Sequence, residues 1–205
     1  MQELKHKQSI LNETLSLIPW EGCNDKSMRT ACKNLGLDEE YGFIIFPNGI
    51  IDLISDFNQM IDIKMNEKLS TLPLNSMKIR DKIFEAIKIR LAEYNAYKLA
   101  VKKILAFYAF PGNNFEGLKS LYKTTDNIWY SIGDNSTDFN FYTKRASLAV
   151  LYLNSVIYWS SDDSINNENS LRFVQKQIDL LLKFNPKKIL STAFNNIPFL
   201  RLINR

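Results

Sequence analysis

Side chains that could carry out catalysis are few in this sequence. The 205 residues include one histidine, His6, and two cysteines, Cys23 and Cys32. His6 lies between two lysines on the polar side of a predicted helix, so we expect it to be exposed and to take no part in a catalytic triad or a zinc site. The cysteines lie nine positions apart, which is not the C-x-x-C spacing of redox or zinc sites. We predict two reduced, structural thiols.

Other kinds of chemistry also lack their motifs. Neither a G-x-G-x-x-G nor a G-x-x-x-x-G-K-[ST] loop is present, so no phosphate cradle of the usual kinds is expected. Residues 161–170 are rich in Asp, Asn and Ser, but they lack the central glycine and final glutamate of a calcium loop, and we predict a solvated loop. Asp62 falls on the polar side of a predicted helix. The sequence therefore predicts no enzyme, no metal and no cofactor.

The composition favours a folded, helical protein. Hydrophobic residues make up 45% and charged residues 23%, which is typical of soluble globular domains, and 7 Gly and 6 Pro are too few for the many turns of a β-protein. The net charge of +4 does not by itself imply nucleic acid. The most apolar run, residues 146–159, is shorter than the roughly 20 residues that cross a bilayer. The N-terminal residues resemble no leader peptide, which predicts a cytoplasmic protein.

Apolar residues recur at helical spacing along most of the chain, and Pro, Gly and Asn clusters separate the segments. The first helix is expected to stop before Pro19. The predicted helices cover residues 1–18, 25–34, 38–46, 50–69, 79–91, 95–110, 115–132, 138–160 and 171–184. We predict an all-α protein with three parts: a three-helix unit (1–47), a helical lipid-binding body of about six helices (48–185) and a basic, amphipathic C-terminal segment (186–205).

The first three helices resemble the helix-turn-helix unit of TetR-type regulators. The resemblance lies in residues 28–37 and 41–49, which close on Phe46-Pro47 before the next amphipathic helix. A DNA-reading helix needs basic or amide side chains, but Asp38, Glu39 and Glu40 open this one and residues 38–46 contain no basic residue. The sequence therefore predicts a TetR-like fold without nucleic-acid binding, and a TetR-type transcriptional regulator remains the alternative function.

Residues 126–146, DNIWYSIGDNSTDFNFYTKRA, resemble the signature of the Coq-nine family of ubiquinone biosynthesis accessory proteins. Phe173 and the Phe46-Pro47 region also resemble that family, although it commonly has Trp where this chain has Phe141. The resemblance implies a non-catalytic protein that holds an isoprenoid lipid or phospholipid and presents it to the demethoxyubiquinone hydroxylase. Without a mitochondrial presequence, it also implies a bacterial protein peripherally associated with the inner face of the cytoplasmic membrane.

Residues around the signature are the expected binding residues. One face of the helix over 138–160 is expected to line a lipid cavity, through Tyr142, Ala146, Ala149, Leu153 and Val156; ordinary core packing is the alternative for Tyr142. Phe141 and Arg145 are expected to face outward as a docking surface. The full set expected to bind the partner is Trp129, Asp138, Asn140, Phe141, Tyr142 and Arg145.

The C-terminal segment combines apolar and basic residues. Its predicted membrane-binding residues are Lys187, Lys188, Leu190, Phe194 and Ile197, which suit an anionic membrane surface. The alternative is a helix docked on the body. TetR-like folds often dimerise through their last two long helices, so by analogy we expect that this chain can form a homodimer.

Overall fold

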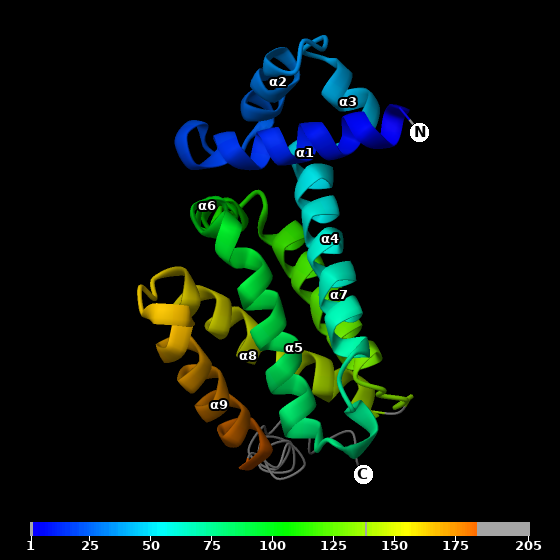
Figure 1. The fold of residues 1–205 in the computed structure, drawn as a ribbon, viewed down its shortest axis with the longest axis vertical. Helices are drawn as coiled ribbons and strands as arrows, with labels where there is room; N and C mark the ends of the chain where they lie inside the picture. Colours follow the sequence, from blue (N-terminus) through cyan, green and yellow to red (C-terminus); the bar gives the residue numbers. More distant parts are fainter. Residues whose placement is uncertain (1, 138, 184–205) are drawn as a thin grey trace, which may run out of the picture.

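The computed structural model describes residues 2–137 and 139–183, and over these residues the chain is helical without any strand (Figure 1). The elements in order are α1 (Gln2–Glu21), α2 (Asp25–Asn34), α3 (Tyr41–Ile45), α4 (Ile50–Ser70), η1 (Leu74–Ser76), α5 (Ile79–Tyr94), η2 (Asn95–Tyr97), α6 (Lys98–Ala109), α7 (Asn114–Ser131), α8 (Phe139–Ser160), η3 (Ile165–Asn167) and α9 (Glu168–Lys183). The predicted all-α class is confirmed.

Helices α1–α3 gather at one end of the molecule, and α4 leads from them into the body (Figure 1). The buried face of α1, which includes Ile10 and Ile18, packs against α2, where Met28 and Cys32 are also buried. Asn24 caps α2 by accepting a hydrogen bond from the Ser27 amide at 3.2 Å. Helix α1 also packs against α6 of the body, and the division at residue 47 stays a prediction.

Two boundaries in this unit differ from the sequence prediction. Pro19 lies inside α1, because a proline so close to the end costs only one backbone hydrogen bond, and α1 continues to Glu21 before Gly22 at φ 89°. Helix α3 begins only at Tyr41, since the Asp38 carboxylate accepts a hydrogen bond from the Glu40 amide at 2.8 Å and holds a turn there.

The prediction that His6 is exposed was wrong. Its ring is half-buried, meets the Tyr41 ring edge-on at 5.6 Å, and its Nδ1 lies 3.2 Å from the Tyr41 hydroxyl. His6 thus joins α1 to α3, which is a structural role.

The body is built from α4–α9 around a continuous apolar core. Trp159, Phe57, Leu53 and Met65 are among its largest fully buried side chains. Helices α8 and α9 pack together, and the rings of Tyr158 and Phe173 stack at 4.4 Å.

The loop after α8 is not simply solvated, which corrects the prediction for residues 161–170. Asp162 is buried, and its carboxylate accepts hydrogen bonds from the amides of Ser164 at 2.9 Å and Ser170 at 2.8 Å. Burial alone would raise its pKa, but the bonds from Ser170 and Ser164 hold the pKa of Asp162 well below the usual value. By accepting from the Ser170 amide, the Asp162 carboxylate caps the N-terminus of α9.

Candidate functional site

A cavity of about 80 Å³ lies in the body between α4, α5, α6, α7 and α8. No charged side chain lines it, and most of its lining is aliphatic or aromatic. The lining residues are Phe57, Asn58, Tyr94, Val101, Ile104, Leu105, Tyr108, Gly117, Ser120, Leu121, Thr124, Tyr152, Leu153 and Val156. Apolar concave sites with a few placed polar groups are the usual form of small-molecule sites.

One wall of the cavity depends on a close approach of two helices. A Cβ atom on Gly117 of α7 would lie 2.9 Å from Cβ of Tyr108 on α6, so only glycine fits at this spacing. Burial raises the pKa of Tyr108 to about 12, and its hydroxyl is therefore neutral.

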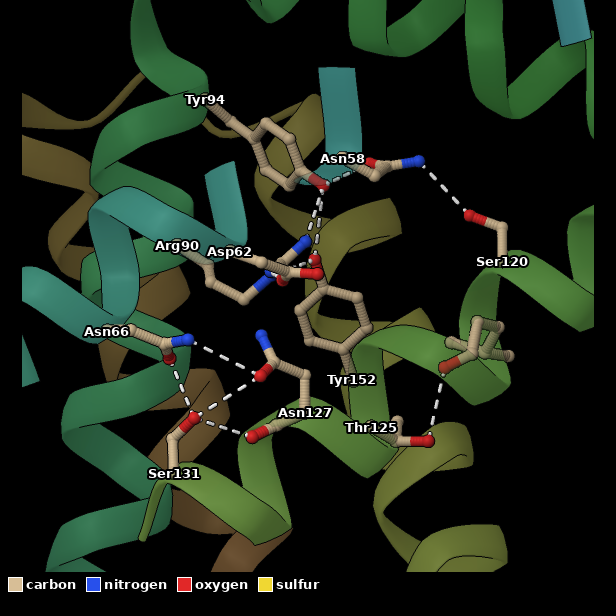
Figure 2. A network of polar contacts seen from close by, with 11 residues as sticks. Asn58, Asp62, Asn66, Arg90, Tyr94, Ser120, Thr125, Asn127, Ser131 and Tyr152 are labelled. Carbon is tan, nitrogen blue, oxygen red and sulfur yellow. Dashed lines mark hydrogen bonds and ion pairs between the residues drawn. The ribbon is translucent and has the colours of Figure 1, made fainter. Parts of the chain in front are cut away.

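A polar network adjoins the cavity, because Tyr94 and Tyr152 belong both to the network, which Figure 2 shows, and to the cavity lining. At its centre, Arg90 of α5 has no exposed surface and forms an ion pair with Asp62 of α4. Arg90 also donates through Nε to the Tyr152 hydroxyl at 2.9 Å and through Nη2 to the Tyr94 hydroxyl at 3.0 Å. The prediction that Asp62 is only a surface carboxylate was wrong, because it neutralises this buried cation.

The network continues from Tyr94 to the cavity wall. The Tyr94 hydroxyl donates to Oδ1 of Asn58 at 2.9 Å, and Nδ2 of Asn58 donates to the Ser120 hydroxyl at 3.1 Å. A second group of contacts lies farther along α4 and α7, where Ser131 donates to Oδ1 of Asn66 at 2.6 Å (Figure 2). Helices α4, α5, α7 and α8 are thus linked by polar side chains, some of which line the cavity.

The residues predicted to line a lipid cavity divide into two groups. Leu153 and Val156 line the cavity described above, but Tyr142 is 67% exposed, Ala146 is also exposed, and Ala149 is half-buried outside the lining. The predicted orientation of Tyr142 and Ala146 was wrong. The buried face of α8 instead carries Leu148, Tyr152 and Trp159, so Tyr142 and Ala146 lie on the opposite, exposed side of the helix.

The predicted outward position of Arg145 was also wrong. Arg145 is 5% exposed and lies against the α7–α8 connection, where its Nε is 2.5 Å from a carboxylate oxygen of Asp126 and its Nη1 is 3.4 Å from one of Asp134. Its guanidinium lies over the ring of Phe141, 3.3 Å from the centroid, so Phe141 is half-buried and not a free anchor. We call Asp126, Asp134, Phe141 and Arg145 the clasp.

Asp134 is the most connected member of the clasp. Its carboxylate accepts from Ser136 at 2.6 Å and from Lys144 at 2.6 Å, and its amide donates to the carbonyl of Trp129 at 3.0 Å. Burial alone would raise the pKa of Asp134, but the bonds from Lys144 and Ser136 hold that pKa below its usual value. The clasp therefore fixes the direction of α8 relative to α7.

Trp129 does not lie on the surface as predicted, because it is 4% exposed and packs into the core. The side chains of Asp138 and Asn140 lie outside the described residues, as do Lys187, Lys188, Leu190, Phe194 and Ile197. Among the residues that the structure describes, no cluster of His, Cys, Asp or Glu could hold a metal ion, and no helix is long and apolar enough to span a membrane.

Sequence comparisons identify relatives of the chain. The COQ9 family model matches residues 115–185. The ubiquinone biosynthesis protein coq9 of Schizosaccharomyces pombe, a mitochondrial protein, is 30% identical over 175 residues, which are 84% of this chain and 68% of that protein. The chain belongs to the COQ9 family. The expected family resemblance is thereby confirmed.

Two more COQ9 relatives are similar over most of this chain. A probable mitochondrial coq9 of Dictyostelium discoideum is 28% identical over 88% of this chain and 60% of the relative. Human mitochondrial COQ9 is 25% identical over 87% of this chain and 57% of that protein. The chain thus spans about 60% of the length of these two relatives.

The fold of this COQ9 chain also has a solved counterpart. A TetR transcriptional regulator from Nitrosomonas europaea superposes with a TM-score of 0.69 at 13% identity, covering 88% of this chain and 99% of the regulator. This likeness confirms the TetR-like fold.

Sequence reasoning missed the polar network around Arg90. Its signal was present, since Asn58, Asp62 and Asn66 recur every four residues on α4, and Arg90 and Tyr94 are four apart on α5. Such spacing places polar groups in one row along a helix, beside the apolar row that enters the core.

Proposed function

We propose that this chain is a non-catalytic, lipid-binding accessory protein of ubiquinone biosynthesis that presents an isoprenoid intermediate to the demethoxyubiquinone hydroxylase at a membrane surface. The observation that supports this function best is the apolar cavity in the body, which lies directly beside an exposed apolar stripe on α8. The COQ9 relatives named above are ubiquinone biosynthesis proteins.

The exposed stripe on α8 suits a protein partner. It consists of Tyr142, Ala146, Val150, Leu153 and Ile157, which recur every three or four residues along one side of the helix. Over the described residues this row is exposed, and a contiguous exposed apolar surface of this kind suits an interaction site. Leu153 belongs both to this stripe and to the cavity lining, so a partner bound to the stripe lies next to the bound lipid.

Native mass spectrometry of the purified protein tests the lipid-binding function. We expect a co-purifying isoprenoid or phospholipid, released when the protein is denatured. A protein that carries no lipid and takes none up from added isoprenoid would contradict the proposal.

Association with the hydroxylase tests the stripe. Tyr142→Ala removes an exposed aromatic ring, and we expect the dissociation constant to rise about tenfold or more, because truncating an aromatic anchor commonly costs over about 1.4 kcal/mol. Ile44→Ala is the matched control, since Ile44 is similarly exposed on α3 at the other end of the molecule (Figure 1). Equal affinities for the wild type and Tyr142→Ala would count against the stripe.

Attachment to a membrane through residues 186–205 stays a prediction, because this segment lies outside the described residues. The bacterial, cytoplasmic-membrane location also stays a prediction, and the three relatives named above are mitochondrial. A homodimer is likewise a prediction.

A DNA-binding regulator is the alternative that the fold suggests. Against it, Asp38, Glu39 and Glu40 are all exposed where α3 begins, and Glu40 pairs with Arg29 of α2 at 2.8 Å. These carboxylates repel phosphate and occupy a nearby basic side chain. A gel shift that weakens with salt along a phosphate-contact slope would favour the regulator.

A further inference from the structure

Exposed apolar side chains follow the outer side of α6 and α7, two helices that pack together as a hairpin (Figure 1). Leu99 and Phe110 lie on this side of α6, and Phe115, Leu118 and Tyr122 recur every three or four residues on α7. The two that flank the turn are the most exposed, Phe110 at 69% and Phe115 at 71%. We call these five residues the ridge.

Hydrogen bonds hold the turn between α6 and α7 in one conformation. The Asn113 amide donates to the Phe110 carbonyl at 2.9 Å, and its side chain donates to a carbonyl in the last turn of α6 at 3.1 Å. The Gly117 amide donates to the Asn113 carbonyl at 3.0 Å, and Gly117 packs closely against Tyr108. A fixed turn therefore keeps the rings of Phe110 and Phe115 in solvent, although burial of an aromatic ring is favourable.

Lysines accompany the ridge on both helices. Lys102 and Lys103 are exposed on α6, Lys119 and Lys123 are exposed on α7, and Glu116 is the only acidic residue between positions 99 and 123. Glu116 pairs with Lys119 at 3.4 Å. Among the residues that the structure describes, the other three lysines form no ion pair. The ridge thus carries a net positive charge.

The combination of apolar side chains and positive charge suits an anionic lipid bilayer. Rings and aliphatic side chains enter the boundary between head groups and acyl chains, while lysine stems lie along it and place their ammonium groups among the phosphates. A second copy of the chain fits this surface less well. In a two-fold contact the same lysines of both copies would face one another and repel.

The ridge lies on the opposite side of α6 and α7 from the cavity. The inner sides of these helices line the cavity, through Leu105 and Tyr108 on α6 and Gly117 and Leu121 on α7. Because a helix with its side chains is about 10 Å across, a bilayer bound to the ridge lies about that far from the cavity. The exposed stripe belongs to α8, so it does not form part of the ridge.

We propose that the ridge and its lysines dock on the surface of an anionic lipid bilayer, with the rings of Phe110 and Phe115 among the acyl chains. This docking surface is separate from residues 186–205. It orients the protein so that the bilayer lies beside the hairpin that forms one wall of the cavity. The inference rests on the proposed function at a membrane surface.

A fluorescent probe at the turn tests the proposal in the full chain. Asn114→Cys adds an exposed thiol beside Phe115 for an environment-sensitive dye. Burial raises the pKa of Cys23 to about 12, and Cys32 is buried, so the native thiols react slowly. With vesicles that contain phosphatidylglycerol, we expect a blue shift of the dye and quenching by brominated acyl chains. Vesicles of phosphatidylcholine alone should produce neither.

The same dye on Asn75→Cys is the matched control. Asn75 is exposed in η1, and the 16 residues of α5 separate η1 from the start of η2 and α6, so we expect no shift there. Co-sedimentation with vesicles while the dye at position 114 stays in water would overturn the proposal and indicate another attachment surface, such as residues 186–205. Failure to bind anionic vesicles would also overturn it, whereas the lipid-binding function fails only if native mass spectrometry finds no lipid.

Variants separate the apolar and the charged contributions. Phe110→Ser should lower the affinity for anionic vesicles about tenfold or more, because it removes a ring that enters the bilayer. Lys102→Gln with Lys103→Gln should lower this affinity about fivefold per lysine, and less at high salt. Ile44→Ser on α3 and Lys176→Gln on α9 are exposed controls that should leave the affinity unchanged. Wild-type affinity in both ridge variants would exclude the ridge as the docking surface.

Discussion

Two buried arginines, Arg145 and Arg90, differ in the kind of side chains that they contact. Arg145 lies under the α7–α8 connection with two carboxylates, Asp126 and Asp134, and with the face of Phe141. Arg90 has one carboxylate, Asp62, and its remaining contacts are tyrosine hydroxyls that reach the cavity wall. The partners of Arg145 all belong to one local stretch of chain, whereas those of Arg90 come from three helices.

The comparison distinguishes a structural contact, at Arg145, from a candidate binding site, at Arg90. The clasp around Arg145 fixes the conformation of the α7–α8 connection. The stripe through Tyr142 then faces outward. The network around Arg90 joins α4, α5 and α8, and its two tyrosines line the cavity. The predictions below, in order of decreasing effect, test whether these two roles are distinct.

Removing the cation of the network should have the largest effect. Arg90→Met leaves Asp62 largely buried without its partner, and we expect the free energy of unfolding to fall by about 3–5 kcal/mol in chemical denaturation. Arg172→Met is the control, since the ion pair of Arg172 with Glu168 is exposed, and it should change this free energy by less than about 1 kcal/mol. A loss below about 1 kcal/mol for Arg90→Met would mean that the network does not support the core.

Weakening the clasp should cost less. Asp134→Asn removes the charge that Lys144 and Arg145 share, but Arg145 keeps Asp126, so we expect a loss of about 1–3 kcal/mol. This variant should also associate more weakly with the hydroxylase, because the start of α8 loses its fixed direction, while the lipid bound to the purified protein, measured by native mass spectrometry, stays unchanged. A change in the bound lipid would contradict the separation of the two regions.

Acid should erase the difference between wild type and Asp134→Asn. The folded-state pKa of Asp134 lies below its unfolded value of about 3.9, so the carboxylate contributes stability that is fully present above about pH 5. That contribution is lost as pH falls through the folded pKa. We therefore expect the two unfolding free energies to converge below about pH 4, in denaturation series at several pH values. A gap that stays constant down to pH 3 would exclude this carboxylate as its source.

The helices could be predicted from sequence because each carries a long apolar row of its own. The rows through Ile54, Phe57 and Ile61 and through Ile83 and Ile87 predicted α4 and α5 within a few residues of their observed ends. Errors arose where a single side chain decides a boundary. The Asp38 turn that delays α3 is one such case.

The site was predictable only in part, because helical periodicity gives the faces of a helix but not the one that meets its neighbours. The signature around Arg145 drew attention to the correct stretch, yet Arg145 and Phe141 turned out to contact each other and the α7–α8 connection. The Arg90 network depends on helices far apart in sequence, up to the 62 positions between Arg90 and Tyr152, and no local pattern joins them.

The glycine at position 117 also sets a dimension of the site. Because α7 meets Tyr108 of α6 at a distance that excludes even a methyl group, any larger residue at 117 requires the two helices to separate or the tyrosine to move. This one position therefore acts as a spacer that fixes the width of the cavity. Exchanging Gly117 for alanine or serine should therefore change the width of the cavity, and with it the size of the ligand that the protein accepts.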